Sequence, residues 1–223
     1  MTEMYRSRLA LLSVSRVYGG PCGICRGTYP SMHILEQDLE IMAALKVETA
    51  DLHKRVESLM PFFDENLSLE KYRETLAAFL GFYEPIERAL LEIAGWEAVE
   101  IDLLERQRAH LLRADLQILG FDPREIAELP RCHDLPRFQD SSDGLGCLYV
   151  LEGSTLGGQL IARELSRRFG IDANSGSSFF CSGSKVRGMW MEFCSVVRKY
   201  VDDSAKRSAA LRSASETFIS FET

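Results

Sequence analysis

The chain has 223 residues, of which 46% are hydrophobic, and it carries a formal net charge of −7 with a pI of about 5.2. An acidic chain repels phosphate backbones, which argues against a nucleic-acid partner. No apolar run approaches the roughly 18 residues that a membrane-spanning helix needs, so we expect no membrane partner. The six scattered cysteines fit a reducing compartment, and we expect a cytoplasmic protein.

The N-terminal segment differs in composition from the rest of the chain. Residues 1–31 hold four arginines against one glutamate, a net charge of 4 − 1 = +3. Cys22 and Cys25 form a CxxC motif, which is typical of zinc or redox sites, but no second ligand pair follows at a suitable spacing. We therefore predict a basic, disordered extension over residues 1–34 and one domain over residues 35–223.

From about Glu36 onward the hydrophobic pattern is helical, and no period-two alternation bounded by hairpin turns stands out. The sequence therefore predicts an all-α fold. The first long helix has a core-facing stripe at helical spacing, made of Leu45, Thr49, Leu52, Val56 and Leu59.

Three later segments are also predicted to be helices. One begins at a Ser68 cap and is expected to be interrupted near Gly81 or Pro85. A single amphipathic helix is expected over residues 99–120, ended by Gly120. The C-terminal segment from Ser204 is expected to be the last helix.

The flank of the first helix carries a possible ligand site. Glu57 lies one turn beyond His53, where it could orient the imidazole directly or through water, as metal-binding histidines require. Lys46 lies two turns before His53, about 10 Å along the helix. This is a plausible distance from a metal at His53 to a carboxylate at the periphery of the ligand. On this helix alone, a surface histidine beside a surface ion pair is the simpler interpretation.

Glycines interrupt the helical segment "YVLEGSTLGGQLI". Gly153, Gly157 and Gly158 should each cost about 1 kcal/mol relative to alanine. Gly146, Gly153 and Gly157 also fall within roughly 60° of one another around the helix, since each residue turns it by about 100°. Close packing of another helix, a kink or break, or a flat ligand lying on the backbone would each explain such a stripe. Close packing is the commonest of these causes.

Two motifs together resemble the heme oxygenases. These are "TADLHKRVE" and "LGCLYVLEGSTLGGQLI", and "LRADLQILG" and "FFCSGSKVRGMWMEF" add to the likeness. The bacterial branch that supplies biliverdin to bacteriophytochromes is the most similar. The resemblance covers the chain from about Leu35 and implies a heme oxygenase-like helical bundle, with heme sandwiched between a proximal and a distal helix.

The resemblance also implies roles for individual residues. His53 matches the proximal iron ligand, and Glu57 matches the residue that supports it. Lys46 matches a lysine near the heme propionates, and Arg187, with Lys185 beside it, is a further candidate for a propionate. The glycines that match those of the distal helix, where backbone approaches the iron-bound oxygen, are Gly153, Gly157 and Gly158.

One position departs from many members of the family. They carry an aspartate after the first distal glycine, where this chain has Ser154 followed by Thr155. The similar bacterial branch also lacks that aspartate. A catalytic water would then depend on the two hydroxyls, together with Gly153, or on an arginine such as Arg106 or Arg108. Solvated surface charge is the simpler interpretation of both arginines.

The resemblance implies an enzyme that uses molecular oxygen and electrons from a reductase or ferredoxin to cleave heme to biliverdin, CO and ferrous iron, and a bacteriophytochrome is a candidate acceptor of the product. A non-catalytic heme carrier or sensor is the main alternative. A thiaminase-II-like hydrolase on the same scaffold is a third, but it would need a nucleophilic cysteine beside a carboxylate. His33, His110 and His133 show no ligand cluster and are taken as ordinary residues.

Overall fold

The protein is described by a computed structural model that covers residues 40–181 and 185–222. Every regular element in these ranges is a helix, which confirms the predicted all-α class. The description concerns the compact unit Ile41–Thr223. The predicted extension, its boundary at residue 35, the CxxC motif and His33 lie outside the described residues. Within the described ranges, no helix combines the length and the apolar character that a membrane crossing requires.

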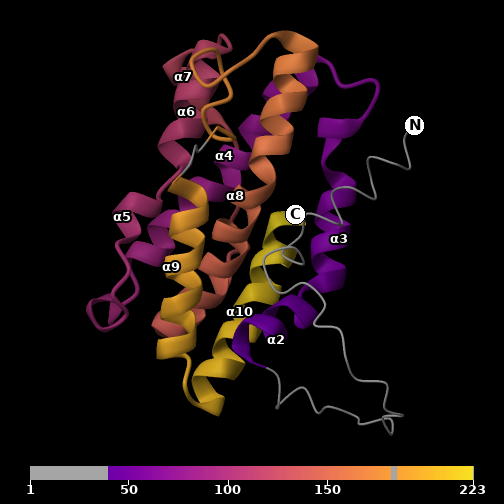
Figure 1. Ribbon diagram of the computed structural model, residues 1–223. Helices are drawn as coiled ribbons and strands as arrows, with labels where there is room; N and C mark the ends of the chain where they lie inside the picture. The colour runs from indigo at the N-terminus through magenta and orange to yellow at the C-terminus, as the bar shows by residue number, and fades with distance from the viewer. Residues whose placement is uncertain (1–39, 182–184, 223) are drawn as a thin grey trace, which may run out of the picture. The chain divides into compact units, whose positions relative to one another are not determined.

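Figure 1 labels the α-helices in chain order. They are α2 (Ile41–Glu48), α3 (Ala50–Leu59), α4 (Leu69–Leu91), α5 (Leu103–Arg106), α6 (Ala109–Ile118), α7 (Pro123–Glu128), α8 (Ser141–Phe169), α9 (Lys185–Tyr200) and α10 (Ser204–Glu222). Two short 3-10 helices, η2 (Pro61–Phe63) and η3 (Trp96–Ala98), complete the set in the described ranges.

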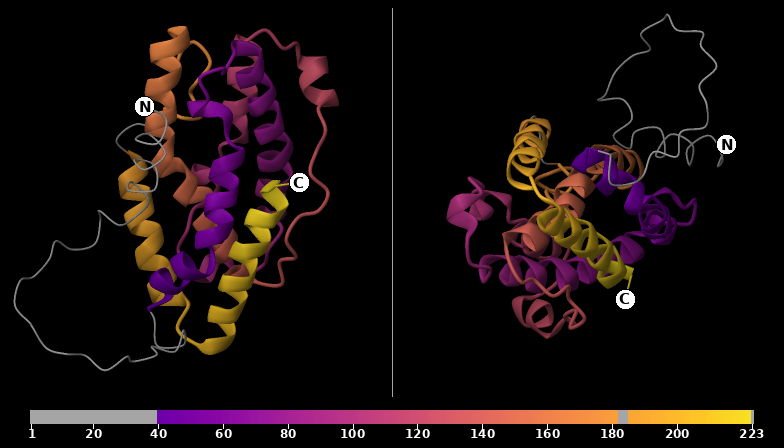
Figure 2. Two further views of the ribbon diagram at one scale, coloured as in Figure 1. Left: turned by 90° about the vertical axis from the view of Figure 1, so that its right-hand side faces the viewer. Right: turned by 90° about the horizontal axis from the view of Figure 1, so that it is seen from below.

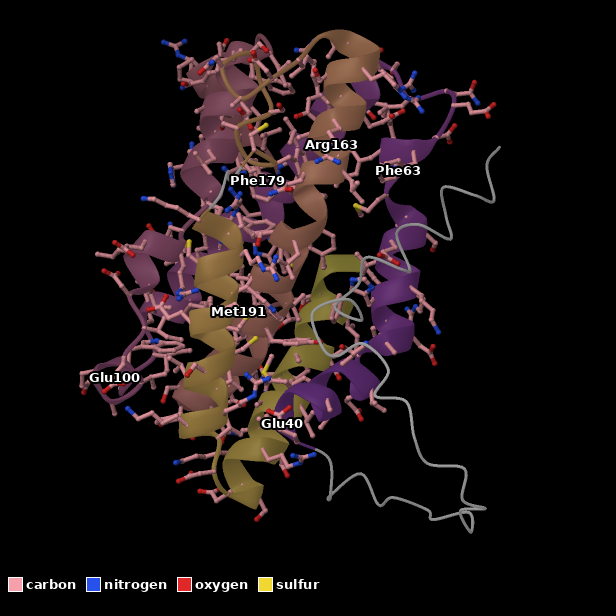
Figure 3. All side chains as sticks on the ribbon, viewed as in Figure 1. Glu40, Phe63, Glu100, Arg163, Phe179 and Met191 are labelled. Carbon is pink, nitrogen blue, oxygen red and sulfur yellow. The ribbon has the colours of Figure 1, made fainter. Side chains whose placement is uncertain are left out.

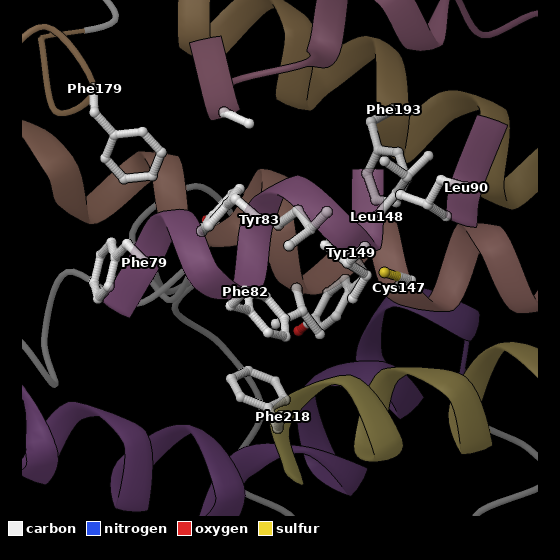
Figure 4. Close-up of a cluster of buried hydrophobic side chains, with 14 of the residues drawn as sticks. Phe79, Phe82, Tyr83, Leu90, Cys147, Leu148, Tyr149, Phe179, Phe193 and Phe218 are labelled. Carbon is white, nitrogen blue, oxygen red and sulfur yellow. The ribbon is translucent and has the colours of Figure 1, made fainter. Parts of the chain in front are cut away.

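Helix α8 runs through the centre of this unit (Figures 1 and 2). Its first part, Ser141–Glu152, is buried at every position. It packs along α10 and against α9, while α4 pairs with α6, and α10 also contacts α2 and α3. Figure 4 shows the aromatic core between these helices, where Phe82 of α4, Tyr149 of α8 and Phe218 of α10 lie. The core therefore surrounds only one end of α8.

Helix α4 is unbroken, so the predicted interruption near Gly81 or Pro85 is wrong. Pro85 has no N–H to donate to the carbonyl of Gly81, four residues earlier. That carbonyl instead accepts a hydrogen bond of 2.9 Å from the backbone N–H of Cys132. A Cβ on Gly81 would lie 2.7 Å from the carbonyl oxygen of Pro130, so glycine admits the segment that supplies the missing donor. The predicted cap is confirmed, since Ser68 Oγ accepts from the Lys71 N–H at 3.0 Å.

The single helix expected over residues 99–120 is divided in the structure into α5 and α6, which is a correction. The chain leaves the helical conformation at Gln107 and Arg108. The carboxylate of Glu87, on α4, accepts the backbone N–H of Arg108 at 2.6 Å and that of Ala109 at 3.2 Å. A side chain from another helix thus caps α6, because the first N–H groups of a helix lack partners within it.

The first helix is also divided, into α2 and α3, with Thr49 between them. Its hydroxyl donates to the carbonyl of Leu45 at 2.7 Å, a local bond that often bends helices. Leu45 and Thr49 are buried as predicted. Leu59 is 59% exposed, so its assignment to the core is wrong. No residue of α3 is fully buried, because the core covers this helix only in part.

Candidate functional site

A contact between Thr49 and Tyr149 joins the histidine helix to the glycine helix. The side chains of Thr49 and Tyr149 lie beside each other. Burial raises the pKa of Tyr149 to about 12, and the neighbouring Thr49 side chain acts in the opposite direction. Thr49 lies one helical turn before His53, and Tyr149 lies one turn before Gly153. The shared contact therefore brings the two sequence motifs to neighbouring places in the fold.

Beyond this contact both helices are incompletely covered. No residue of α3 is buried, and in α8 after Glu152 only Gly158 and Leu165 are buried. The extensive contacts of α3 are with α2 and α10, and those of α8 are with α9, α10 and η2. Figure 3 shows Phe63 of η2 and Arg163 of α8 at the same end of these helices. The partly covered lengths of the two helices are the candidate walls of a binding site.

His53 is held by groups on two helices. Its Nδ1 lies 3.6 Å from Oε2 of Glu57, a separation that a bridging water or a small movement would turn into a hydrogen bond. Its ring meets the edge of Phe218 on α10 at a centroid distance of 5.8 Å. Its side chain is 41% exposed. Because Nδ1 faces Glu57, Nε2 is the nitrogen left for a ligand. Arg55 also pairs with Glu222, which ties α3 to the end of α10.

The glycines of α8 divide into different roles. A Cβ on Gly146 would collide with the backbone carbonyl of Ala210, so this glycine permits the close approach of α10. A Cβ on Gly158 would lie 3.1 Å from the carbonyl oxygen of Phe180. At Gly153 the nearest atom is 3.8 Å away, in the ring of Trp190. At Gly157 nothing lies within 4 Å. Close packing therefore explains Gly146 and not Gly157, which borders open space, and α8 is continuous through the whole stripe.

Ser154 takes part in a hydroxyl pair. Its Oγ donates to the carbonyl of Leu151 at 2.7 Å and lies 2.9 Å from the hydroxyl of Tyr83, on α4. Since the Ser154 hydrogen is directed to Leu151, Tyr83 donates to Ser154. Burial raises the pKa of Tyr83 to about 12, so its hydroxyl stays protonated at neutral pH. The pair therefore offers oxygen lone pairs to a water, which would keep a second hydrogen to donate elsewhere.

Thr155 and the two candidate arginines have other partners. The Thr155 hydroxyl donates to the carbonyl of Glu152 at 2.7 Å. Arg106 pairs with Glu152 at 3.1 Å and with Glu192 at 2.8 Å, and its side chain is only 4% exposed. Arg108 donates to the carbonyl of Phe179 and lies over its ring, and burial lowers the pKa of Arg108. The interpretation of both arginines as solvated surface charge is therefore wrong.

The candidate propionate residues lie on different helices. Lys46 is half-buried on α2, on the far side of the bend at Thr49 from His53, and Arg187 is exposed in the first turn of α9. Neither assignment is tested by these positions. His110 and His133 are exposed, and the described residues contain no group of three or more His, Cys, Asp or Glu side chains placed to hold a metal ion. Among the described histidines, His53 therefore remains as the candidate ligand.

This arrangement fits a flat ligand that carries a metal with one protein ligand. A neutral imidazole with a free nitrogen is a usual ligand of heme iron. The bare backbone at Gly157 borders open space, from which a ligand could approach it. Two of the described cysteines do not fit the hydrolase alternative, because Cys147 and Cys194 are buried and burial raises the pKa of Cys147 to about 12.

Sequence reasoning missed three residues of this site, Tyr83, Tyr149 and Phe218. Each is an aromatic residue at helical spacing, a pattern typical of a hydrophobic core. The motif "LYVLEG" places Tyr149 next to the glycines, but its partner Thr49 lies 100 positions away in the chain. Only the packing of α4, α8 and α10 brings these side chains together.

The fold defines an all-α bundle in which the helix of His53 and the glycine-containing helix α8 are brought to neighbouring places. Residues 39–223 match the family model for heme oxygenase. A heme oxygenase of Xanthomonas campestris pv. campestris (strain 8004) is 30% identical over 157 residues, which are 70% of this chain and 84% of that protein. The chain therefore belongs to the heme oxygenase family, and it is an enzyme of that family.

Two solved structures show the same fold. The NO- and CO-bound heme oxygenase from Neisseria meningitidis matches with a TM-score of 0.65 at 20% identity, covering 82% of this chain and 89% of that one. Heme oxygenase from Leptospira interrogans matches with a TM-score of 0.62 at 17% identity, covering 82% of this chain and 97% of that one. The predicted heme oxygenase-like bundle is thus confirmed.

Proposed function

We propose that this chain binds heme between α3 and α8 and cleaves it to biliverdin, CO and ferrous iron, using molecular oxygen and an external electron donor. The observation that carries the proposal is the placement of His53 and Gly153, each one turn beyond the place where the Thr49 and Tyr149 side chains lie beside each other. Heme, when bound, supplies both the iron that binds oxygen and the porphyrin that is opened. Every other function in the site falls to side chains and backbone of this chain.

His53 is proposed as the axial ligand through Nε2, with Glu57 orienting the ring through Nδ1. The edge of Phe218 limits rotation of the imidazole. An imidazole ligand does not push electron density toward the bound oxygen as a cysteine thiolate does, which suits oxidation of the porphyrin itself. Lys46 and Arg187 are proposed to pair with the propionates, because both are cations on helices beside the site.

The opposite wall is proposed to be α8. Gly157 would present backbone to the ligand face, and the open space beside it supports this. Gly153 and Gly158 face Trp190 and Phe180, and they are proposed to shape α8 beside the ligand. The Tyr83–Ser154 pair is proposed to hold the catalytic water by accepting one of its hydrogens, which leaves the other for the ligand. Thr155 is proposed to contribute less, since its hydroxyl is directed to the carbonyl of Glu152.

The electron donor is proposed to be a reductase or ferredoxin, and the product acceptor a bacteriophytochrome. The acceptor is supported by the two motifs that resemble the phytochrome-associated branch, including a serine at position 154 in place of the aspartate. A cytoplasmic location is supported by Cys132, Cys147 and Cys181, none of which forms a disulfide.

The test is to mix purified protein with hemin, record the spectrum, and add a reductant in air. We expect a histidine-ligated heme spectrum that decays with the appearance of biliverdin, identified by chromatography, together with CO and chelatable ferrous iron. A stable heme complex that yields no biliverdin would instead support the carrier or sensor alternative. A chain that binds no heme would refute both.

A further inference from the structure

Arg106 joins three helices at a buried position. It ends α5, and its side chain is almost fully enclosed. Its Nη1 lies 3.1 Å from Oε1 of Glu152 on α8, and its Nη2 lies 2.8 Å from Oε2 of Glu192 on α9. Nη1 also donates to the carbonyl oxygen of Met189, on α9, at 3.4 Å. One guanidinium therefore holds α8 and α9 to each other.

Two of these partners are chain neighbours of residues that face each other across the same interface. Glu152 directly precedes Gly153, and Met189 directly precedes Trp190. A Cβ on Gly153 would lie 3.8 Å from Cζ3 of Trp190, so the indole packs over Gly153 at the distance of one methyl group. Trp190 is buried, and its ring centroid lies 5.9 Å from that of Tyr149. Arg106 thus binds α8 at Glu152 and α9 at Met189, next to the place where the two helices face each other.

A contribution to stability does not explain such a buried ion pair well. Removing charges from water costs several kcal/mol per ion, and apolar replacements of whole buried pairs are often neutral or stabilising. Burial raises the pKa of Glu152, and Arg106 opposes this shift. A planar guanidinium does, however, hold two carboxylates in a defined geometry, which an apolar side chain cannot do. The triad therefore suits a role in setting the spacing of α8 and α9.

We propose that Arg106 is a positioning residue that fixes Trp190 against Gly153 and thereby sets which edge of the substrate porphyrin can lie over this part of α8. The inference rests on the proposed function, in which heme lies on the same stretch of helix. Arg106 would influence the position of ring cleavage without touching the heme, because its guanidinium is engaged by Glu152, Glu192 and the Met189 carbonyl.

The first test uses the heme-free protein. The chain has two tryptophans, so Trp96→Phe leaves Trp190 as the single tryptophan, which can be excited selectively at the red edge of the absorption band. In this background, acrylamide should quench Trp190 weakly, because the indole is 2% exposed. Arg106→Met should raise the quenching constant severalfold. Arg106→Lys should give an intermediate quenching constant, since an ammonium is a point charge and lacks the planar set of N–H donors with which a guanidinium binds two carboxylates.

A second variant separates the loss of the contacts that Arg106 makes with α8 and α9 from the effect of an unpaired buried charge. Arg106→Met alone leaves Glu152 uncompensated and could unfold the chain. Arg106→Met combined with Glu152→Gln removes both buried charges, so the fold should persist while quenching stays raised. Arg167→Met is the matched control, because Arg167 is an exposed α8 arginine that pairs with Glu164. Its quenching constant should equal that of the parent.

The second readout is the ratio of ring-opened isomers made by the heme-loaded double variant. We expect the ratio to shift while the histidine-ligated spectrum is unchanged, since His53 lies on α3. Unchanged quenching in both Arg106 variants would overturn the proposal, and so would raised quenching with an unchanged isomer ratio. A parent chain that binds no heme would refute the proposed function. The quenching series would still show whether Arg106 holds Trp190 in its buried position.

Discussion

The hydroxyl of Tyr83 on α4 lies 2.9 Å from the hydroxyl of Ser154 on α8, directly after Gly153. Both groups of this pair are neutral hydroxyls. The Ser154 hydroxyl donates its hydrogen to the Leu151 carbonyl, and the Tyr83 hydroxyl donates its hydrogen to Ser154. Toward a water molecule, both hydroxyl oxygens can therefore only accept hydrogen bonds. This arrangement leads to the first prediction.

Tyr83→Phe and Ser154→Ala should each slow heme turnover by about tenfold or less, because one neutral hydrogen bond is worth about 0.5–1.5 kcal/mol. Heme affinity should be kept, since neither hydroxyl is proposed as an iron ligand. The measurement is the rate of biliverdin formation against a hemin titration. Tyr72→Phe is the control, because Tyr72 is a buried α4 tyrosine that donates to the Gly176 carbonyl. It should lower stability and leave turnover unchanged, and equal slowing by Tyr72→Phe would contradict a local role of the pair.

His53→Ala should abolish the histidine-ligated heme spectrum and nearly all turnover. The helical fold should persist, because His53 is half-exposed and α3 has no fully buried residue. Added imidazole should partly restore both properties by occupying the vacated position. Glu57→Gln should weaken heme binding or turnover about tenfold, the lower end of the usual effect of losing a group that orients a metal ligand. Normal ligated spectra in His53→Ala would show that another residue holds the iron.

Gly157→Ala and Gly146→Ala should have opposite effects on the heme-free protein. At Gly157 the new methyl group meets open space, so the free energy of unfolding should rise by about 0.5–1 kcal/mol from helix propensity. At Gly146 it would collide with the Ala210 carbonyl, so that free energy should fall by about 1–3 kcal/mol. Urea unfolding monitored by circular dichroism measures both.

The ligand-binding consequence of Gly157→Ala needs its own control. Gly188 on α9 is also helical and also borders open space. Gly188→Ala should give a similar gain in stability with no change in heme affinity, whereas Gly157→Ala should weaken heme binding. Equal heme affinities for the two variants would contradict the proposal that α8 lines the heme site.

Glu87 should make stability depend on pH. Burial raises its pKa from 4.5 to about 7, against the hydrogen bonds that it accepts from Arg108 and Ala109. A raised folded-state pKa contributes stability that is present below about pH 4.5 and is lost as the pH rises through 7. The shift of 7 − 4.5 = 2.5 units corresponds to roughly 3 kcal/mol between these limits. Glu87→Gln should flatten this dependence in urea unfolding between pH 5 and pH 8, and an unchanged slope would contradict the assignment.

The sequence by itself determined the class of fold, and it pointed to the two helices of the candidate site. Helical periodicity and the absence of hairpin signals led to an all-α chain, because the 3.6-residue repeat is a local property of the pattern. His53 with Glu57, and Gly153 with Gly157, could be recognised because each pair lies within one turn of one helix. Helix ends that depend on local caps, such as the start of α4 at Ser68, were also within reach.

Tertiary structure decided the features that depend on hydrogen-bonding and packing partners distant in the chain. The continuity of α4 depends on Cys132 replacing the donor that Pro85 lacks, and the division between α5 and α6 depends on Glu87. The glycine stripe looks uniform in the sequence, yet Gly146 meets α10 and Gly157 meets open space. Burial of Arg106 and the pairing of Tyr83 with Ser154 likewise arise between helices. Periodicity specifies which face of a helix a residue occupies, whereas only packing specifies what lies opposite that face.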